Sequence, residues 1–266
     1  MNPGPASYRQ VVDRYENTAQ HNDEVFAAFT AATWADPLLA EHRRHIEEQK
    51  LGYGDPAFHA LWRLLLDEAR NRFSQVDVME IGVFKGQVVS LWALLAKTNH
   101  WLLRLHGITP FEGQPLPGAR WWRSLQARVN PWFRARIRSG DYYPEDDYEQ
   151  IVRRLFARYG LSFDRVRWIR GYSQDPPVLA AVEHDAFHLI YIDGGHTYEM
   201  ARADIANYAP RIVRGGWLVM DDAGYDLPGT TFWKGYESVA RACRILPDLG
   251  FRNVLNVGHN RVFEKS

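Results

Sequence analysis

Three carboxylates that directly follow apolar segments could do chemistry together. An apolar segment, residues 187–192, runs straight into Asp193, and the pair Asp221 and Asp222 directly follows the segment GGWLVM. If both segments are neighbouring parallel strands, the three carboxylates converge at one edge of a sheet, where they repel one another unless a positive charge lies among them. Such oxygen ligands suit a hard divalent cation, Mg²⁺ first and Mn²⁺ or Ca²⁺ after it. Any one aspartate could instead cap a helix or form a surface ion pair, but the three together favour a metal site.

His196 lies three residues after Asp193, in the turn that enters the next predicted helix. A lone histidine in a glycine turn is usually solvent-exposed and without a function. Beside a metal and a cofactor, however, it can act as a general base. It would then accept the proton of a hydroxyl whose oxygen attacks a methyl sulfonium.

A glycine turn in MEIGVFKGQVVS separates a predicted strand from a predicted helix and contains Glu80, Gly82 and Gly86. Glycines allow the backbone to turn sharply and to approach a ligand, although an ordinary strand-to-helix turn can have the same pattern. Phe84 occupies the position of the second glycine of a dinucleotide fingerprint, which disfavours a nicotinamide oxidoreductase. An acidic residue with this looser glycine pattern suits S-adenosylmethionine.

The elements that must position these residues alternate along the chain. The predicted strands VDVMEIG, HWLLRLHGI, RVRWIRG, HLIYIDGG and GGWLVMDD are interspersed with the helical segments QVVSLWALLAKT, DDYEQIVRRLFARYG and EMARADIANYAPRI. This alternation predicts an α/β fold with a doubly wound, mostly parallel, Rossmann-like sheet, which binds ligands beyond the carboxyl ends of its strands. KGYESVARACRILPDLG predicts a further helix, and RNVLNVGHNRVFEK predicts a terminal hairpin.

The first 72 residues have helical patterns, including YRQVVDRYENTAQ near the start. Asp55 is expected to cap the last of these helices and Pro56 to be its first residue. We therefore expect an N-terminal helical cap region over residues 1–72 and an α/β domain over residues 73–266. The cap region would cover the site or form the interface of a homo-oligomer.

A basic and aromatic insertion is expected at about residues 112–140. It could be a lid with aromatic faces for a sugar and arginines for an anionic group, or equally a subunit contact or an amphipathic helix. A contact with a membrane surface is a minority interpretation. After the paired aspartates, Phe232 or Trp233 could lie near the substrate, although a core position for Trp233 is at least as well supported. The residues that characterise the insertion are Arg120, Trp121, Trp122, Arg123, Arg128, Trp132, Phe133, Arg134, Arg136 and Arg138.

Composition excludes several classes of protein. Among the 266 residues, 32 basic side chains balance 32 acidic ones. The lack of net positive charge argues against a general binder of polyanions such as nucleic acid. The only cysteine, Cys243, leaves no internal disulfide and is expected in the core of a protein from a reducing compartment. The chain has no apolar signal segment and no run of 18 apolar residues. We expect a cytoplasmic protein without a membrane span.

Five motifs in this order resemble the class I S-adenosylmethionine-dependent methyltransferases: MEIGVFKG, HGITPFEG, IRGYSQD, IYIDGGHTYEMARADI and IVRGGWLVMDDAG. The resemblance covers roughly residues 50–245. It is strongest to the metal-dependent O-methyltransferases of bacterial sugar and natural-product pathways, of the macrocin and novobiocin type, with cephalosporin hydroxylase-like proteins as close relatives.

The resemblance implies a role for each matching residue. Glu80, Gly82 and Gly86 would line the methionine end of the cofactor, His196 would be the base, and Asp193, besides bordering the cofactor, would hold Mg²⁺ with Asp221 and Asp222. Bordering the adenine would be Gly171, Tyr172 and Ser173. The family usually has an acidic residue for the ribose hydroxyls where this chain has Thr109, a weaker partner for two hydroxyls. Glu112 could take its place.

These observations predict a Mg²⁺-dependent O-methyltransferase that acts on a hydroxyl of a sugar or a glycosylated metabolite. Two alternatives remain open. One is a methyltransferase with a catechol or another phenol as its acceptor, and the other is a non-catalytic adenosyl-binding partner protein. The complete set of three aspartates and His196 argues against the non-catalytic alternative.

Overall fold

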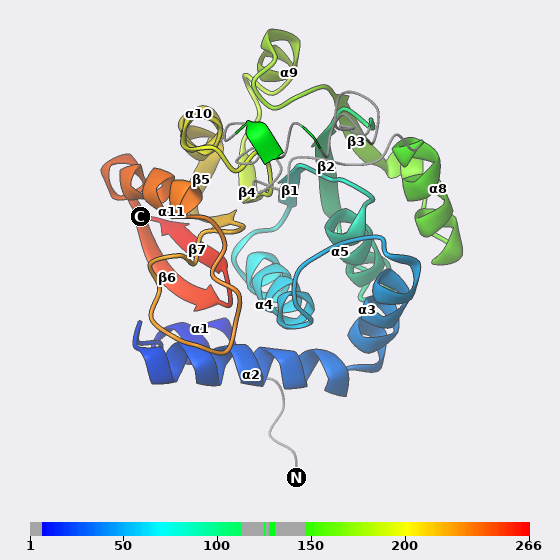
Figure 1. Ribbon diagram of the computed structural model, residues 1–266. Helices are drawn as coiled ribbons and strands as arrows, with labels where there is room; N and C mark the ends of the chain where they lie inside the picture. Colours follow the sequence, from blue (N-terminus) through cyan, green and yellow to red (C-terminus); the bar gives the residue numbers. More distant parts are fainter. Residues whose placement is uncertain (1–6, 113–124, 126–127, 131–146) are drawn as a thin grey trace.

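The computed structural model describes residues 7–112, 125, 128–130 and 147–266. Its centre is a seven-stranded sheet in the order β3-β2-β1-β4-β5-β7-β6 (Figure 1). Strands β1 to β5 are parallel, and β7 is antiparallel to both β5 and β6. The doubly wound, mostly parallel sheet and the terminal hairpin are thus confirmed. The strands are β1 (Val76–Ile81), β2 (Leu103–Thr109), β3 (Val166–Arg170), β4 (Phe187–Ile192), β5 (Ile212–Met220), β6 (Phe251–Val257) and β7 (Asn260–Lys265).

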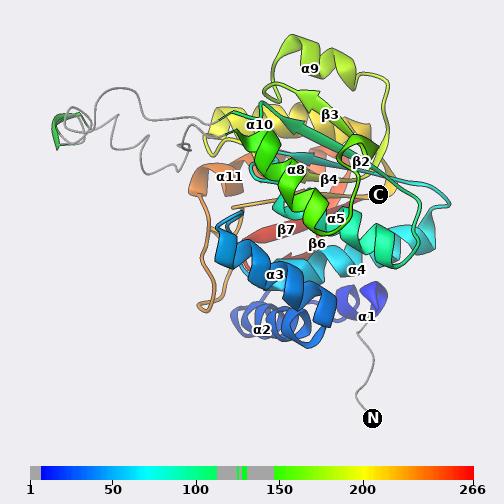
Figure 2. The same ribbon diagram turned by 90° about the vertical axis from the view of Figure 1, so that its right-hand side faces the viewer.

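Helices cover both faces of the sheet (Figure 2). One face packs against α4 (Ala57–Arg72), α5 (Gln87–Thr98) and α8 (Tyr148–Arg158). The other packs against α9 (Pro176–Ala181), α10 (Tyr198–Tyr208) and α11 (Glu237–Ala242). A parallel strand in this arrangement is buried on both sides and is therefore mostly apolar. All six residues of β1 are buried, and four of them are apolar; the other two are Asp77 and Glu80.

The N-terminal helices extend the first of these layers. They are α1 (Tyr8–Val12), α2 (Ala19–Ala35) and α3 (Pro37–Gln49). Helix α2 packs against α4 and β6, and α3 packs against α4 and α5. Helix α4 itself belongs to the same hydrophobic core as the sheet. The predicted division into residues 1–72 and 73–266 stays a prediction.

Three local expectations are wrong. The predicted helix over residues 8–20 is interrupted: α1 ends at Val12, and a new helix begins at Ala19 with the Thr18 side chain as its cap. Helix α4 begins at Ala57 with Pro56 as N-cap, and the Asp55 side chain does not cap it. The last predicted helix is α11 followed by two 3₁₀ turns, the second of which contains Pro247; a proline there cannot donate the backbone hydrogen bond that would continue an α-helix.

Two further expectations concern single features. Cys243 is buried, as expected, and burial raises the pKa of its thiol to about 12. Of the predicted insertion, only Glu112, Leu125 and residues 128–130 are among the described residues, so its role stays a prediction. Within the described part of the chain, none of the helices combines the length and apolar character needed to cross a membrane.

Candidate functional site

The strand register brings the predicted site residues to one edge of the sheet. Ile81 of β1 is paired with Ile108 of β2 and with Ile192 of β4. Ile192 is in turn paired with Met220 of β5. The residues that come next, at the carboxyl ends of these strands, are Gly82, Thr109, Asp193 and Asp221. The predicted convergence of the carboxylates is therefore what the strand order and register produce.

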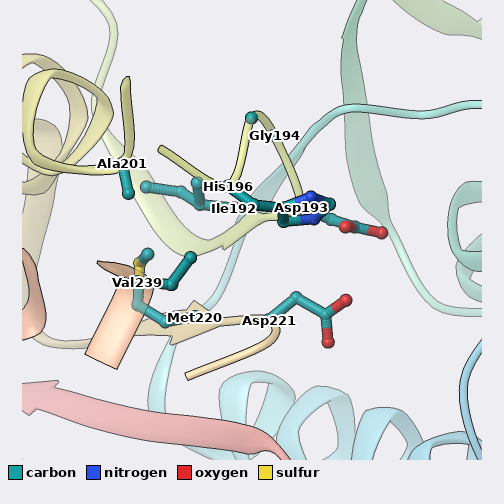
Figure 3. Close-up of a pocket in the computed structure, with 9 residues that line it drawn as sticks. Ile192, Asp193, Gly194, His196, Ala201, Met220, Asp221 and Val239 are labelled. Carbon is teal, nitrogen blue, oxygen red and sulfur yellow. The ribbon is translucent and has the colours of Figure 1, made fainter. Parts of the chain in front are cut away.

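Asp193 and Asp221 line one pocket at this edge, together with His196 and the two glycines between (Figure 3). Backbone hydrogen bonds continue the sheet into both residues: the Asp193 N–H donates to the carbonyl of Ile81 at 2.9 Å, and the Asp221 N–H donates to the carbonyl of Ile192 at 3.0 Å. The carboxylates thus start from fixed backbone positions on adjacent strands.

Asp222 is turned away from the strand direction by an uncommon backbone conformation. Its φ is 54°, in the left-handed region that few non-glycine residues adopt. The Tyr236 N–H donates to its carbonyl at 2.8 Å, and Gly235 packs so closely on its backbone that a Cβ there would lie 2.1 Å from the carbonyl oxygen. This conformation lets two consecutive aspartates both contribute to the edge.

His259 is a site residue that the sequence analysis missed. It lies in the turn between β6 and β7 and is 3% exposed. Its Nε2 lies 3.4 Å from Oδ1 of Asp221 and 3.6 Å from Oδ1 of Asp222. The sequence signal is slight, a single imidazole in the turn of a predicted hairpin, and only the pairing of β7 with β5 brings that turn to the carboxylates.

The ionisation of these groups is strongly interdependent. Burial, and then the charges of Asp221 and Asp222, raise the pKa of Asp193 well above its usual range. Burial and the charge of Asp221 also raise the pKa of Asp222. Burial opposes the ionisation of Asp221 as well, but His259, a hydrogen bond with Asp193 and the charge of His196 together hold the pKa of Asp221 below its usual value. Burial alone would lower the pKa of His259, yet the two carboxylates raise it.

The residues at this edge fit a divalent cation. One donor atom each from Asp221, Asp222 and His259 lie within 4.8 Å of one another. The buried Oδ1 of Asp221 has no hydrogen-bond partner among the described residues. Asp193 is outside this group of three, although it interacts directly with Asp221. Crowded carboxylates of this kind are stabilised in their charged forms by a cation.

His196 lies beside the carboxylates, as predicted. Its Nε2 is 2.9 Å from Oδ2 of Asp222, and its ring stacks on Tyr236 with centroids 4.4 Å apart. Its carbonyl accepts a hydrogen bond from Ser238. The imidazole is therefore oriented by a carboxylate on one edge and by an aromatic ring on one face.

The glycine turn after β1 is built around a close approach of two strand ends. Gly82 has a φ of 91°, and a Cβ there would lie 1.8 Å from the carbonyl oxygen of Asp193. Gly86 has a φ of 88° and precedes α5. The Val89 N–H at the start of α5 donates to Oε2 of Glu80 at 2.8 Å. Glu80 thus caps a helix, and burial raises its pKa well above the usual range.

The two candidates for the ribose position differ in exposure. Thr109 is 3% exposed, and its Oγ1 accepts a hydrogen bond from the Phe111 N–H at 3.1 Å. Glu112 is exposed. Thr109 therefore lies at the predicted edge but already uses its hydroxyl to shape the turn that leads to Glu112. Which of the two holds the ribose stays a prediction.

The loop after β3 is held against α10. The Gly171 N–H donates to the carbonyl of Thr109 at 3.1 Å, which joins the ends of β2 and β3. Oγ of Ser173 donates to Oδ1 of Asp204 at 2.7 Å, and burial raises the pKa of Asp204 to about 6. Tyr172 is half-exposed. The predicted adenine side of the site thus lies at the same edge of the sheet as the glycine turn, and its role stays a prediction.

The loop between β5 and α11 borders the metal candidates. Trp233 is 52% exposed, so the alternative of a core position for it is wrong. Its ring contacts His259 and Tyr236 edge-on, at centroid distances of 5.1 and 5.4 Å. Phe232 is buried, 5.6 Å from the Phe26 ring of α2. An exposed indole therefore stands next to the carboxylate and imidazole cluster, where it can contact a substrate.

Known proteins resemble the chain in sequence and in fold. A family model described as a methyltransferase domain matches residues 79–223, which include the glycine turn and all three aspartates. The 8-demethyl-8-(2,3-dimethoxy-alpha-L-rhamnosyl)-tetracenomycin-C 4'-O-methyltransferase of Streptomyces olivaceus is 30% identical over 151 residues, which are 56% of this chain and 54% of that protein. The chain thus spans about half the length of this relative.

Solved structures share the fold. The O-methyltransferase NovP superposes with a TM-score of 0.57 and 18% identity, covering 78% of this chain and 79% of that one. The calicheamicin methyltransferase CalS11 superposes with a TM-score of 0.55 and 17% identity, covering 99% of both chains. At such identities the likeness establishes the fold alone, and with CalS11 it includes the N-terminal helices.

Proposed function

The chain belongs to the methyltransferase domain family, and on this premise we propose that it transfers a methyl group from S-adenosylmethionine to a hydroxyl of a sugar or a glycosylated metabolite. The observation that carries the proposal is the gathering of the glycine turn, Asp193, His196, Asp221 and Asp222 at one edge of the sheet. The similarity to an enzyme named for methylating a rhamnosylated compound supports the choice of acceptor class.

The cofactor would lie across the carboxyl ends of β1, β2 and β3. Gly82 and Gly86 give the backbone the left-handed conformations that a close approach to a ligand needs. Gly171 has a φ of 139° at the end of β3 and faces the same edge. Thr109 or Glu112 would contact the ribose, and Tyr172 with Ser173 would border the adenine.

The metal would be held by the aspartates, with Mg²⁺ or another hard divalent cation as the proposed ion. When bound, S-adenosylmethionine supplies an electrophilic methyl group and the cation supplies the positive charge that acidifies an acceptor hydroxyl. His196 takes the proton of that hydroxyl. Asp222, 2.9 Å from Nε2 of His196, orients the ring and stabilises its charged form. Catalysis would otherwise depend on holding the two substrates in line.

Isothermal titration with S-adenosylhomocysteine tests the cofactor, with Mg²⁺ present and NAD as the control ligand. We expect binding of S-adenosylhomocysteine and none of NAD. Binding of NAD alone would contradict the proposal. Absence of both would mean that the cofactor site with Thr109 in the ribose position is not functional, and would favour a different kind of ligand.

A methyl-transfer assay over a panel of glycosides, with catechols as the comparison, tests the acceptor. His196→Ala is expected to lower kcat by about 10²-fold or more while S-adenosylhomocysteine still binds, because a general base contributes about 10²- to 10⁴-fold. Asp193→Ala should abolish turnover for want of a metal ligand. Turnover of catechols alone would assign the phenol alternative, and unchanged kcat in His196→Ala would exclude this base. The expected cytoplasmic location, homo-oligomer and absence of nucleic-acid binding stay predictions.

A further inference from the structure

We propose that His259 is a ligand of the metal in this site, together with Asp221 and Asp222, and that the mixed imidazole and carboxylate donors favour Mn²⁺ over Mg²⁺. The inference rests on the proposed function and refines its metal. The metal ligands that the family resemblance implies are aspartates at the ends of β4 and β5. His259 lies elsewhere, in the turn between β6 and β7.

The geometry of the three donors carries the proposal. Nε2 of His259 points at both carboxylates, 3.4 Å from Oδ1 of Asp221 and 3.6 Å from Oδ1 of Asp222. These distances exceed those of strong hydrogen bonds, and three such donors within 4.8 Å can converge on one ion. The imidazole is 3% exposed, and neither its Nδ1 nor Oδ1 of Asp221 has a hydrogen-bond partner in the described part of the chain.

The turn that bears His259 is fixed in place. Its carbonyl accepts a hydrogen bond from the Ala223 N–H at 2.9 Å, directly after the paired aspartates. Gly224 passes so close that a Cβ there would lie 2.9 Å from the Cα of His259. Phe58 packs edge-on against the imidazole with centroids 4.7 Å apart, and Trp233 does so at 5.1 Å. A ligand held this rigidly loses little conformational entropy on binding an ion.

Asp55 occupies the position of a supporting carboxylate. Its Oδ2 lies 3.9 Å from Nδ1 of His259, on the side of the ring away from Asp221 and Asp222. Histidines that bind metals usually donate the other ring N–H to a carboxylate, which fixes the tautomer and strengthens the ligand. This position also gives the side chain of Asp55 a use other than capping α4. Asp55 would act as a positioning residue through His259.

A different role for His259 is that of a permanent counter-ion, a protonated imidazole that neutralises the carboxylates instead of a metal. The two roles predict opposite results. Removing a ligand weakens metal binding, whereas removing a competing positive charge leaves metal binding unchanged or strengthens it. The metal preference follows from the donors: Mg²⁺ selects oxygen ligands almost exclusively, whereas imidazole nitrogen suits transition metals and carboxylates suit Mn²⁺.

The experiment measures Mn²⁺ and Mg²⁺ dissociation constants of the full chain by calorimetry, and the nitrogen coupling of bound Mn²⁺ by pulsed electron paramagnetic resonance. The unaltered chain should bind Mn²⁺ more tightly than Mg²⁺, and its bound Mn²⁺ should show the coupling of one imidazole nitrogen. His259→Ala should weaken Mn²⁺ binding at least about 10-fold and remove that coupling, and Asp55→Asn should weaken it while the coupling remains. His259→Asn, which offers an oxygen, should lose the preference for Mn²⁺.

His106→Ala is the matched control. His106 is also buried and also contacts an aspartate, with Nε2 3.4 Å from Oδ1 of Asp77, but at the opposite ends of the strands. Its removal should leave both constants unchanged. Unchanged or tighter Mn²⁺ binding in His259→Ala would overturn the proposal, as would a missing nitrogen coupling in the unaltered chain. Binding of neither ion by the unaltered chain would overturn it together with the metal part of the proposed function, while S-adenosylhomocysteine binding tests the methyltransferase itself.

Discussion

At the scale of single residues, the site depends on how closely two backbone segments approach each other. Gly82 follows β1 and touches the carbonyl of Asp193, the first residue after β4. Its φ of 91° is one that residues with a Cβ rarely adopt. Position 82 therefore needs a glycine for two reasons. It lets the backbone of Asp193 pack against β1, and it would let a cofactor approach the backbone closely.

Gly82→Ala should lower the free energy of unfolding by at least about 2 kcal/mol, because backbone strain of about 1–3 kcal/mol adds to a clash that only backbone movement can relieve. Denaturant unfolding measures the loss. Gly250→Ala is the control: its φ is 82°, but a Cβ there meets nothing within 4 Å, so strain alone should cost about 1 kcal/mol. Equal losses in the two variants would show that contact with Asp193 is unimportant.

At the scale of elements, the sequence could predict whatever depends on neighbours along the chain. The apolar runs that become buried parallel strands, and the aspartates that directly follow two of them, are local patterns, so the edge of the sheet could be located from them. His259 could not, because it reaches Asp221 only through the pairing of β7 with β5. The contact of Asp55 with His259 also joins two distant segments, so the sequence around Asp55 predicts only a helix cap.

A buried polar chain joins three helices that the sequence predicted only as separate segments. Nδ1 of His42 in α3 lies 3.0 Å from Nε2 of His59 in α4, and Nε2 of His42 lies 3.0 Å from Oγ of Ser90 in α5. Burial lowers the pKa of His42 from 6.5 to about 3, and it lowers the pKa of His59 well below the usual range. Both imidazoles are therefore neutral in the folded protein at neutral pH.

These pKa values predict acid sensitivity. Since the unfolded chain takes up a proton on His42 below about pH 6.5 and the folded chain only near 3, the stability is fully present above 6.5 and falls as the pH decreases toward 3, by up to about 1.4 kcal/mol per pH unit. Urea unfolding at several pH values across this range measures the free energy of unfolding. In His42→Gln this free energy should fall less steeply with decreasing pH than in the unaltered chain. Ser90→Ala, which removes a hydrogen bond but no titrating group, should lose about 1 kcal/mol at every pH with the slope kept. If the pH dependence of stability were unchanged in His42→Gln, His42 would not be a source of the acid sensitivity.

At the scale of the whole molecule, helices α1 to α4 and the sheet share one core. Trp62 of α4 packs edge-on against Trp92 of α5 and Tyr191 of β4, with centroids 5.3 and 4.7 Å apart. Helix α2 holds the loop that bears Trp233, because Asp23 accepts hydrogen bonds from the backbone N–H groups of Thr230 and Thr231. The family match begins at residue 79, after α4, whereas the likeness to CalS11 covers 99% of the chain. The matched region thus lacks a helix that covers one face of the sheet.

We therefore expect a chain that begins at residue 73 not to fold, and a chain that begins at residue 51, which keeps α4, to fold with lower stability. Losing one buried Leu or Trp side chain costs about 2–5 kcal/mol, and a domain has only about 5–15 kcal/mol in total; α4 contributes several such side chains, among them Leu61, Trp62, Leu65 and Leu66. Circular dichroism and thermal unfolding of the two chains distinguish the outcomes. Cooperative unfolding of the chain from residue 73 would instead support the sequence-based division, with residues 1–72 as a cap that the α/β domain does not need in order to fold.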